Sequence, residues 1–352
     1  MQHFLWKGKA MKGVSFGGLH SFYEWGLILS EKEIKAPKPK TIEFDIEGSD
    51  GVLDFTEFFG GVKYENRQLT FKFYSIDPED FLTLFSTVQN AIHGKKMQVI
   101  LDDDPAFFYY GRVTVNEWKS NKRLGEITIE VNAEPYKYKV ARTSQPASLS
   151  GKNLINLDNY ENKTANLWTR TDTGFSFVRG TALGNSYVVF RVPVVAGKTY
   201  TFSASKTATG DDPLMVVYSD KVFGNVIARG SQKVTFAAGH TGFHAFALIA
   251  NSATETVDYS NVMLEEGSVV TTYEAFAGTE NTISVFLENL KMPSVPSIYS
   301  QDDITITNGE ETLVIHAGEV LTVEEFQLKE GSNQFNITGT GAVVFDWQEG
   351  GL

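Results

Sequence analysis

The stretch Gly125–Val131 reads GEITIEV, so that isoleucine and valine alternate with polar residues along its whole length. Alternation with a period of two is typical of a strand that has one buried face. Leu69–Phe73 (LTFKF) and Thr41–Ile46 (TIEFDI) repeat the pattern, and Gly, Asn and Asp separate such runs along most of the chain. We therefore expect a mainly β protein whose short, half-buried strands form sandwiches or barrels.

One segment predicts a helix that packs on a sheet. Asp77 is the expected N-cap, Pro78 suits the first helical position, and Gly94 is placed as the C-terminal cap. Lys95 and Lys96 follow, where cations stabilise the end of a helix. Apolar side chains at spacings of four, three and four form one stripe along this helix: Phe81, Phe85, Val88 and Ile92.

Composition excludes several classes of protein. The 352 residues contain no cysteine, which rules out a disulfide scaffold, a thiolate metal site and a cysteine nucleophile. The net charge is −12, and residues 278–352 hold twelve acidic and two basic residues, so most of the charge lies there. No basic block is longer than Lys95–Lys96, so we expect no nucleic-acid partner, and no apolar run is long enough to predict a membrane span.

Two segments interrupt the strand pattern. Lys35–Lys40 (KAPKPK) cannot be helical, because each proline restricts the residue before it, and it predicts an extended loop. Ala141–Gly151 is small, polar and nearly uncharged, which predicts a linker. After this segment the chain becomes rich in Thr, Ser, Asn and Gly up to residue 277, which indicates a change of domain.

No established catalytic motif is present, and we expect no catalytic group, no metal and no cofactor. His240 and His244 would lie on one face of an extended segment about 13 Å apart, too far to share a metal unless a turn intervenes. Asp102–Asp104 and Asp211–Pro213 predict turns rather than acid pairs. Glu265–Gly267 ends a strand, and a role in glycoside hydrolysis would need a second carboxylate close in space.

The N-terminal region carries five stretches in a fixed order. They are Ser15–Phe22 (SFGGLHSF), Trp25–Ile34 (WGLILSEKEI), Asp45–Thr56 (DIEGSDGVLDFT), Asn66–Phe73 (NRQLTFKF) and Ala133–Tyr138 (AEPYKY). In this order they resemble the N-terminal domain of the distal tail proteins of siphophages that infect Gram-positive bacteria. A series of this length is far more specific than any single motif within it.

Two further parts of the chain resemble known modules. Leu328–Ile337 and Val343–Leu352 are similar to the end of the galectin-like C-terminal domain of the same family. The middle resembles the jelly rolls of carbohydrate-binding modules, through Gly151–Ile155, Val194–Ala204 and Asn261–Ser268. Distal tail proteins with such an insertion are often called evolved.

The resemblance implies three domains. Residues 1–138 would form the N-terminal ring (belt) domain, with one helix. Residues 139–150 and 278–352 would form a galectin-like β-sandwich, whose first strand lies around Lys137–Ala141. Residues 151–277 would be a jelly roll inserted into that sandwich.

The resemblance also implies a structural function without catalysis. The family forms a homohexamer between the tail tube protein and the tail-associated hub or lysin protein, so this chain would be assembled in the bacterial cytoplasm and located at the virion tail tip. The inserted module would bind host cell-wall polysaccharide. Two alternatives stay open: a wall-degrading enzyme that uses Glu265 or Glu266, and the same component in a prophage-derived, tail-like bacteriocin.

Strand alternation predicts a saccharide-binding face on the inserted module. Sugar binding needs flat aromatic rings and fixed polar side chains, and arginine also suits phosphate-bearing polymers. The same aromatics could instead fill a core, and the arginines could be solvated. The candidate residues are Trp168, Arg170, Tyr187, Arg191, Tyr218 and His244.

Overall fold

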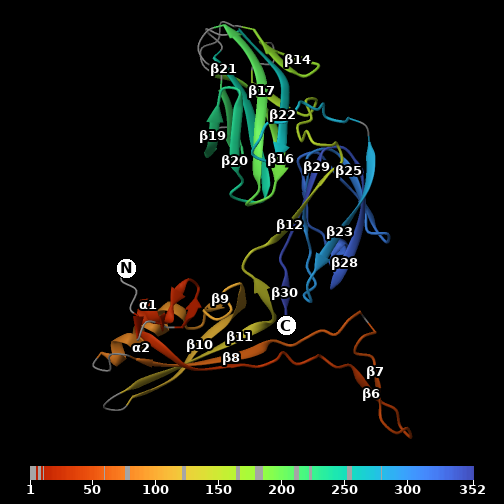
Figure 1. Cartoon of the computed structure of the whole chain (residues 1–352). Coiled ribbons are helices and arrows are strands. Elements are labelled where there is room, and N and C mark those ends of the chain that lie inside the picture. Colours follow the sequence, from red (N-terminus) through yellow and green to blue (C-terminus); the bar gives the residue numbers. More distant parts are fainter. Residues whose placement is uncertain are drawn as a thin grey trace. The chain divides into compact units, whose positions relative to one another are not determined.

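The structure is a computed structural model, which divides into two compact units (Figure 1). Unit 1 comprises Met1–Ala141, Leu290–Met292 and Glu349–Leu352, and unit 2 comprises Arg142–Asn289 and Pro293–Gln348. Most elements are strands, so the prediction of a mainly β protein is confirmed. No helix in the described part has the length and apolar character needed to cross a membrane. The structure describes residues 5–6, 9–10, 12–58, 60–75, 80–120, 124–163, 167–178, 185–209, 214–221, 224–251, 256–278 and 280–352.

Unit 1 is built on one antiparallel sheet of eight strands, and the strand alternation read from the sequence sets its buried face. Leu69, Phe71 and Phe73 of β8 are fully buried, and Ile127, Ile129 and Val131 of β11 match them in burial. A separate hairpin joins β1 (Leu5–Trp6) to β2 (Lys9–Ala10). The sheet strands, in spatial order, are β4 (Leu19–His20), β3 (Val14–Phe16), β9 (Lys96–Leu101), β10 (Phe107–Ser120), β11 (Gly125–Lys139), β8 (Arg67–Ser75) and β5 (Leu27–Ile34), with β30 (Gly350–Gly351) beside β11.

The predicted helix is present as α2 (Phe81–Ile92), and its stripe faces the core through buried Phe81, Val88 and Ile92. The N-cap is Asp80, so the helix begins later than expected from Asp77, which itself lies outside the described residues. The C-cap is His93 rather than Gly94, while Lys95 donates from Nζ to the carbonyl of Ala91 at 2.7 Å, as expected for a cation at a helix end.

The expectation of a single helix was wrong, because a second helix, α1 (Ser21–Trp25), precedes β5. Its five residues are too few to produce a periodic pattern. The His20 ring caps it, since Nδ1 accepts the amide hydrogens of Phe22 and Tyr23 at 3.1 and 3.2 Å. Gly26 ends it in the left-handed conformation at φ 63°.

A long arm leaves the sheet of unit 1 between β5 and β8 and ends in a hairpin of β6 (Glu43–Asp45) and β7 (Val52–Asp54) (Figure 1). The arm begins at the extended segment Lys35–Lys40, as predicted. Every residue of both strands is exposed, so the expected half-buried strand at Thr41–Ile46 was wrong. Alternation predicts one apolar side, but burial of that side requires a partner surface, and unit 1 provides none for these residues.

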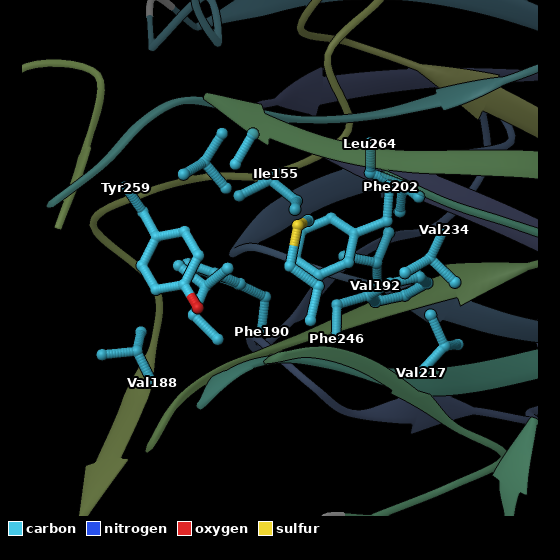
Figure 2. Packing of buried hydrophobic residues seen from close by; sticks show 14 of the residues in the cluster. Ile155, Val188, Phe190, Val192, Phe202, Val217, Val234, Phe246, Tyr259 and Leu264 are labelled. Carbon is cyan, nitrogen blue, oxygen red and sulfur yellow. The ribbon is translucent and has the colours of Figure 1, made fainter. Parts of the chain in front are cut away.

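The strands between residues 161 and 266 of unit 2 form a sandwich of two five-stranded sheets whose inward aromatic and aliphatic side chains share one core (Figure 2). We call it the inserted sandwich, because in the chain it lies between strands of the other sheets of unit 2. Phe190 of the first sheet and Phe202 of the second are both fully buried in it. The first sheet has the order β13 (Glu161–Lys163), β16 (Asn185–Val194), β21 (Gly242–Asn251), β18 (Leu214–Tyr218) and β19 (Val226–Gly230). The second has the order β14 (Trp168–Thr171), β15 (Gly174–Phe177), β22 (Thr256–Glu266), β17 (Thr199–Thr209) and β20 (Lys233–Ala237).

The rest of unit 2 contains two four-stranded sheets around a second core, which includes fully buried Leu287, Ile337 and Phe345. A short 3-10 helix, η2 (Glu324–Phe326), contributes Phe326 to this core. The first sheet is β12 (Thr143–Ser148), β29 (Ala342–Trp347), β24 (Ser297–Ser300) and β27 (Val320–Leu321). The second is β23 (Asn281–Asn289), β28 (Gly331–Gly339), β25 (Ile304–Thr307) and β26 (Thr312–Ile315).

The predicted linker Ala141–Gly151 is mostly a strand, because β12 pairs along its length with β29. Pro146 made this segment look like a break. A proline is compatible with a strand that has a neighbour on one side only, and β12 is such an edge strand. The strand expected around Lys137–Ala141 is the end of β11, which belongs to the sheet of unit 1.

Candidate functional site

The outward face of the sheet β13–β16–β21–β18–β19 holds the best candidate among the predicted residues. Strand register places Arg191 opposite Ala245 and Ala245 opposite Tyr218. In the neighbouring row, Ala247 lies between Val189 and Val216, and Arg229 follows Val216 on β19. We call this surface the arginine face: Tyr187, Val189, Arg191, Val216, Tyr218, Arg229, Ala245, Ala247 and Ile249.

The apolar part of the arginine face forms a small core of its own. Val189, Val216 and Ala247 are at most 2% exposed, and Tyr218 is 4% exposed. Tyr187 is half-buried and packs against this cluster. Burial raises the pKa of the Tyr218 phenol, an effect that the charge of Arg229 opposes and the nearby Tyr187 reinforces. The tyrosines therefore support the face and do not present open rings.

The exposed chemistry of this face comes from its two arginines. Arg191 and Arg229 are both exposed, and neither forms an ion pair with a carboxylate among the described residues. The guanidinium carbon of Arg191 lies 5.3 Å from the centroid of the Phe243 ring, which holds it by a cation–π interaction. Because strands are about 4.8 Å apart, Arg191 on β16 and Arg229 on β19 are separated by three strand spacings, roughly 14 Å. Two arginines at this separation can contact two repeated groups along one polymer chain.

The structure brings three of the six predicted site residues together, namely Tyr187, Arg191 and Tyr218. Trp168 is 6% exposed and lies in the core of the sandwich, where its Nε1 donates to Ser186 Oγ at 2.8 Å. Arg170 shares the inward side of β14 with Trp168 and donates from Nε to the carbonyl of Leu157 at 3.1 Å. These residues do alternate as expected, but their shared side faces the sandwich interior.

His244, the sixth predicted residue, is fully buried and stacks on Phe236 at 6.0 Å between ring centroids. The expected separation from His240 was wrong: the two rings stack with centroids 4.5 Å apart. A turn at residues 239–241 precedes β21 and folds His240 back. Burial, reinforced by the charge of His240, lowers the pKa of His244 to about 4. Within the described residues, no group of three His, Cys, Asp or Glu could hold a metal ion.

The carboxylates considered for catalysis have structural partners. Glu265 is 2% exposed and accepts the amide hydrogen of Thr271 at 2.9 Å and its hydroxyl at 2.7 Å. Glu266 forms an ion pair with Lys198 at 2.8 Å. Glu265 is buried whereas Glu266 is exposed, so the two neighbours do not form an acid pair.

The run Asp102–Asp104 forms a turn before β10, as predicted. Asp102 accepts a hydrogen from the amide of Gly13 at 2.7 Å, and Asp104 forms an ion pair with Lys137 at 2.6 Å. Asp103 pairs with Lys32. Each carboxylate thus binds a different segment of unit 1. The turn predicted at Asp211–Pro213 lies outside the described residues.

A hollow of about 430 Å³, which the sequence did not predict, lies on the second sheet of the inserted sandwich. It lies at a shift of register between β17 and β22, and no sequence motif predicts such a shift. Its lining is Ser203, Ala204, Ser205, Lys206, Gln232, Lys233, Asn261, Met263, Val270, Thr271 and Tyr273.

Comparison with known proteins finds likeness in structure and none in sequence. No protein family and no curated protein matches the sequence. A solved structure of the SPP1 Dit protein, described as a paradigm of the hub adsorption apparatus in phages that infect Gram-positive bacteria, is similar over 97% of this chain and 99% of that one. The identity is 11% and the TM-score is 0.41, a degree of likeness that carries no inference about function.

Proposed function

We propose that this chain is a structural protein of a phage tail tip, a distal tail protein that forms a hexameric ring between the tail tube and the tail-associated hub protein. The observation that carries the proposal is the ordered series of five stretches between Ser15 and Tyr138 that resembles this family. The C-terminal stretches, which resemble the end of the family's second domain, support it independently.

In the local structure, residues of the first of these stretches shape the backbone. Gly17 and Gly18 make the turn between β3 and β4 at φ 59° and 90°, values that suit glycine. His20 caps α1 and also hydrogen-bonds Asp102 at 3.0 Å, while Ser21 Oγ accepts the amide hydrogen of Val14 at 3.1 Å. These residues shape a turn and the start of a helix, which supports a structural function.

The arm of unit 1 supports assembly with other proteins. Phe58 is 71% exposed and Phe44 56% exposed, and other large apolar side chains accompany them. Exposed apolar surface of this kind is typical of an interaction site. The other exposed apolar residues of the arm are Ile42, Ile46, Val52 and Leu53.

The solution mass of the full chain tests the assembly. Light scattering should give six times the mass of one chain, alone or with the tail tube protein present. Phe44→Ser with Phe58→Ser should dissociate the ring with an unchanged far-ultraviolet spectrum. Phe286→Ser in unit 2, where the side chain is 54% exposed, is the matched control and should leave the mass unchanged. A chain that stays monomeric with its tail partners would overturn the proposal.

We further propose that the inserted module binds a host cell-wall saccharide through the arginine face. The two exposed arginines, which form no ion pair with a carboxylate of the described residues, support this, because guanidinium groups bind phosphate and carboxylate through two parallel hydrogen bonds. Six copies in a ring would convert weak single-site binding into firm attachment.

Sedimentation of the full chain with purified host wall polysaccharide tests this second part. Arg191→Ala with Arg229→Ala should lower binding at least about tenfold, the loss of two charge-assisted contacts. Lys35→Ala with Lys119→Ala removes the same charge from exposed positions of unit 1 and should bind as the parent does. Unchanged binding in the arginine variant would contradict the assignment. Release of reducing sugar that Glu265→Gln abolishes would favour the enzyme instead.

A further inference from the structure

The 430 Å³ hollow on the second sheet of the inserted sandwich lies where β22 carries an extra residue. Ser203 pairs with Met263 and Ser205 with Ser260, so Asn261 and Val262 together face Ala204. Two residues against one make a β-bulge, which redirects a side chain and commonly lies beside a functional site. Here the bulge buries Val262 in the core and leaves Asn261 exposed on the hollow.

The backbone of Asn261 is strained. At φ 54° it is the one non-glycine residue with positive φ among those described. The left-handed conformation costs an ordinary residue roughly 1–2 kcal/mol, although asparagine tolerates it better than most. Strain of this kind persists where the surroundings hold it, and it clusters at binding sites. The strain and the hollow are independent observations that coincide at one residue.

The segment after β22 forms the rim of the hollow and is fixed by polar contacts. The buried carboxylate of Glu265 holds Thr271 through two hydrogen bonds, to its amide and its hydroxyl. Lys233 reaches the carbonyl of Ser268 with a long contact of 3.5 Å. Tyr273, next along the rim, is half-buried, and burial raises the pKa of its phenol while the charge of Arg170 opposes the rise. Glu265 thus shapes the hollow without lining it.

The lining has the chemistry of a saccharide site. The amides of Gln232 and Asn261 and the hydroxyls of Ser203 and Ser205 can donate to and accept from sugar hydroxyls. The Thr271 hydroxyl donates its hydrogen to Glu265 and can therefore only accept from a sugar. Tyr273 supplies an aromatic surface for a sugar ring, while Met263 and Val270 add apolar surface. Among the described residues, no carboxylate and no histidine lines the hollow, but two lysines do, Lys206 and Lys233. The lysines favour a ligand that carries negative charge.

We propose that this hollow is a second saccharide-binding site, separate from the arginine face, and that it takes a sugar unit bearing a carboxylate or a phosphate. Asn261 and Gln232 contact its hydroxyls, Tyr273 packs on its ring, and Lys233 contacts its acidic group. The two sites lie on opposite sheets of one sandwich, so a long wall polymer can engage them independently.

Titration of the full chain with small sugars, followed by saturation-transfer NMR, tests this site. The probes are glucuronic acid, glucose 6-phosphate and glucose, which separate the carboxylate, the phosphate and the neutral sugar. At least one acidic probe should bind about fivefold or more tightly than glucose, as expected for one charge-assisted contact. Equal binding of all three probes, or no binding of any, overturns the proposal.

Asn261→Gly is the decisive variant, because glycine adopts the backbone conformation of this residue without strain and the fold is retained. It should lower the affinity for the acidic probe at least about threefold, as expected for the loss of a neutral hydrogen bond. Lys233→Gln should remove the preference for acidic probes over glucose. Binding of the parent strength in both variants would also overturn the proposal.

Two controls separate this site from the arginine face. Thr207→Ala, on β17 beyond the hollow and absent from its lining, should bind all probes as the parent does. Arg191→Ala with Arg229→Ala should leave small-sugar binding unchanged even where it abolishes polymer binding. Loss of small-sugar binding in the arginine variant would place the sugar on the arginine face and contradict the second site.

Discussion

The two outward faces of the inserted sandwich are built from similar strands but differ in the burial and chemistry of their side chains. On the sheet β13–β16–β21–β18–β19, alternate residues that point away from the main core are apolar and bury one another, as Val189 and Ala247 do. On the sheet β14–β15–β22–β17–β20, several outward residues bear hydroxyls, as in Ser205 and Thr207, and a hollow lies beside a bulge. The first face is covered by its own apolar side chains and exposes two arginines, whereas the second face has a hollow lined largely by polar side chains.

The difference shows that an outward position in a strand can be either buried or exposed. Its role depends on the side chains in its cross-strand row and on the local register, because these decide whether neighbours cover it. Variants in the shared core, on the arginine face, at the buried His244 and at the bulge therefore test this comparison. Their expected effects on stability decrease in that order.

Phe246→Ala should cause the largest loss, because both sheets depend on this side chain. Phe246 is fully buried, and its ring lies 5.6 Å from Phe202 and 5.8 Å from Phe236, measured between centroids. The cavity should lower the free energy of unfolding by about 3–5 kcal/mol in chemical denaturation and remove binding at both faces. Phe286→Ala, at an exposed position of β23, should change it by less than about 0.5 kcal/mol. Similar losses in the two variants would refute the shared core.

Ala247→Asp compared with Thr207→Asp isolates the difference between the faces. Aspartate is a poor strand residue at either position, but only position 247 is fully buried, between Val189 and Val216. Burial of an unpaired polar group should cost about 2–4 kcal/mol at position 247, whereas the exposed position 207 should lose less than about 1 kcal/mol. Thermal unfolding of the two full-length variants measures this. An equal loss would show that both faces are open.

The sequence predicted the strands well where alternation and burial agree. Gly125–Val131 and Leu69–Phe73 were expected as strands and lie within β11 and β8. Pattern alone could not decide which side of a strand faces the core, so Trp168 and His244 were expected at a surface although they fill the interior. The bulge at Asn261 escaped prediction for a different reason: it depends on how β17 and β22 pair, a long-range property that neither strand encodes by itself.

His244 makes the interior of the sandwich sensitive to acid. Its pKa is lowered to about 4 by burial in the folded state, against about 6.5 in the unfolded chain, so between these values the unfolded state binds more protons. Stability is therefore greatest above pH 6.5 and should fall as the pH drops towards 4, by roughly 2 kcal/mol. Denaturation curves at pH 7 and pH 4.5 measure the loss.

His244→Phe is the control for this dependence, because phenylalanine can keep the stack on Phe236 and cannot take up a proton. The part of the loss due to this residue should vanish in the variant, so that its stability falls less between pH 7 and pH 4.5. A parent and a variant with the same slope would assign the acid sensitivity to the carboxylates of the chain.

Asn261 should give the smallest effect on stability and the sharpest contrast between the faces. Asn261→Gly removes left-handed strain and should leave the free energy of unfolding unchanged or raise it by up to about 1 kcal/mol, whereas Asn261→Val should lower it by roughly 1–2 kcal/mol. Thr207→Gly, in an ordinary extended conformation on the same outward face, should instead lose about 1 kcal/mol, because glycine weakens a strand. If glycine destabilised both positions equally, Asn261 would not be strained, and the bulge would be an ordinary part of the strand. A gain in stability together with a loss of sugar binding would show that the chain keeps this strained residue for its ligand.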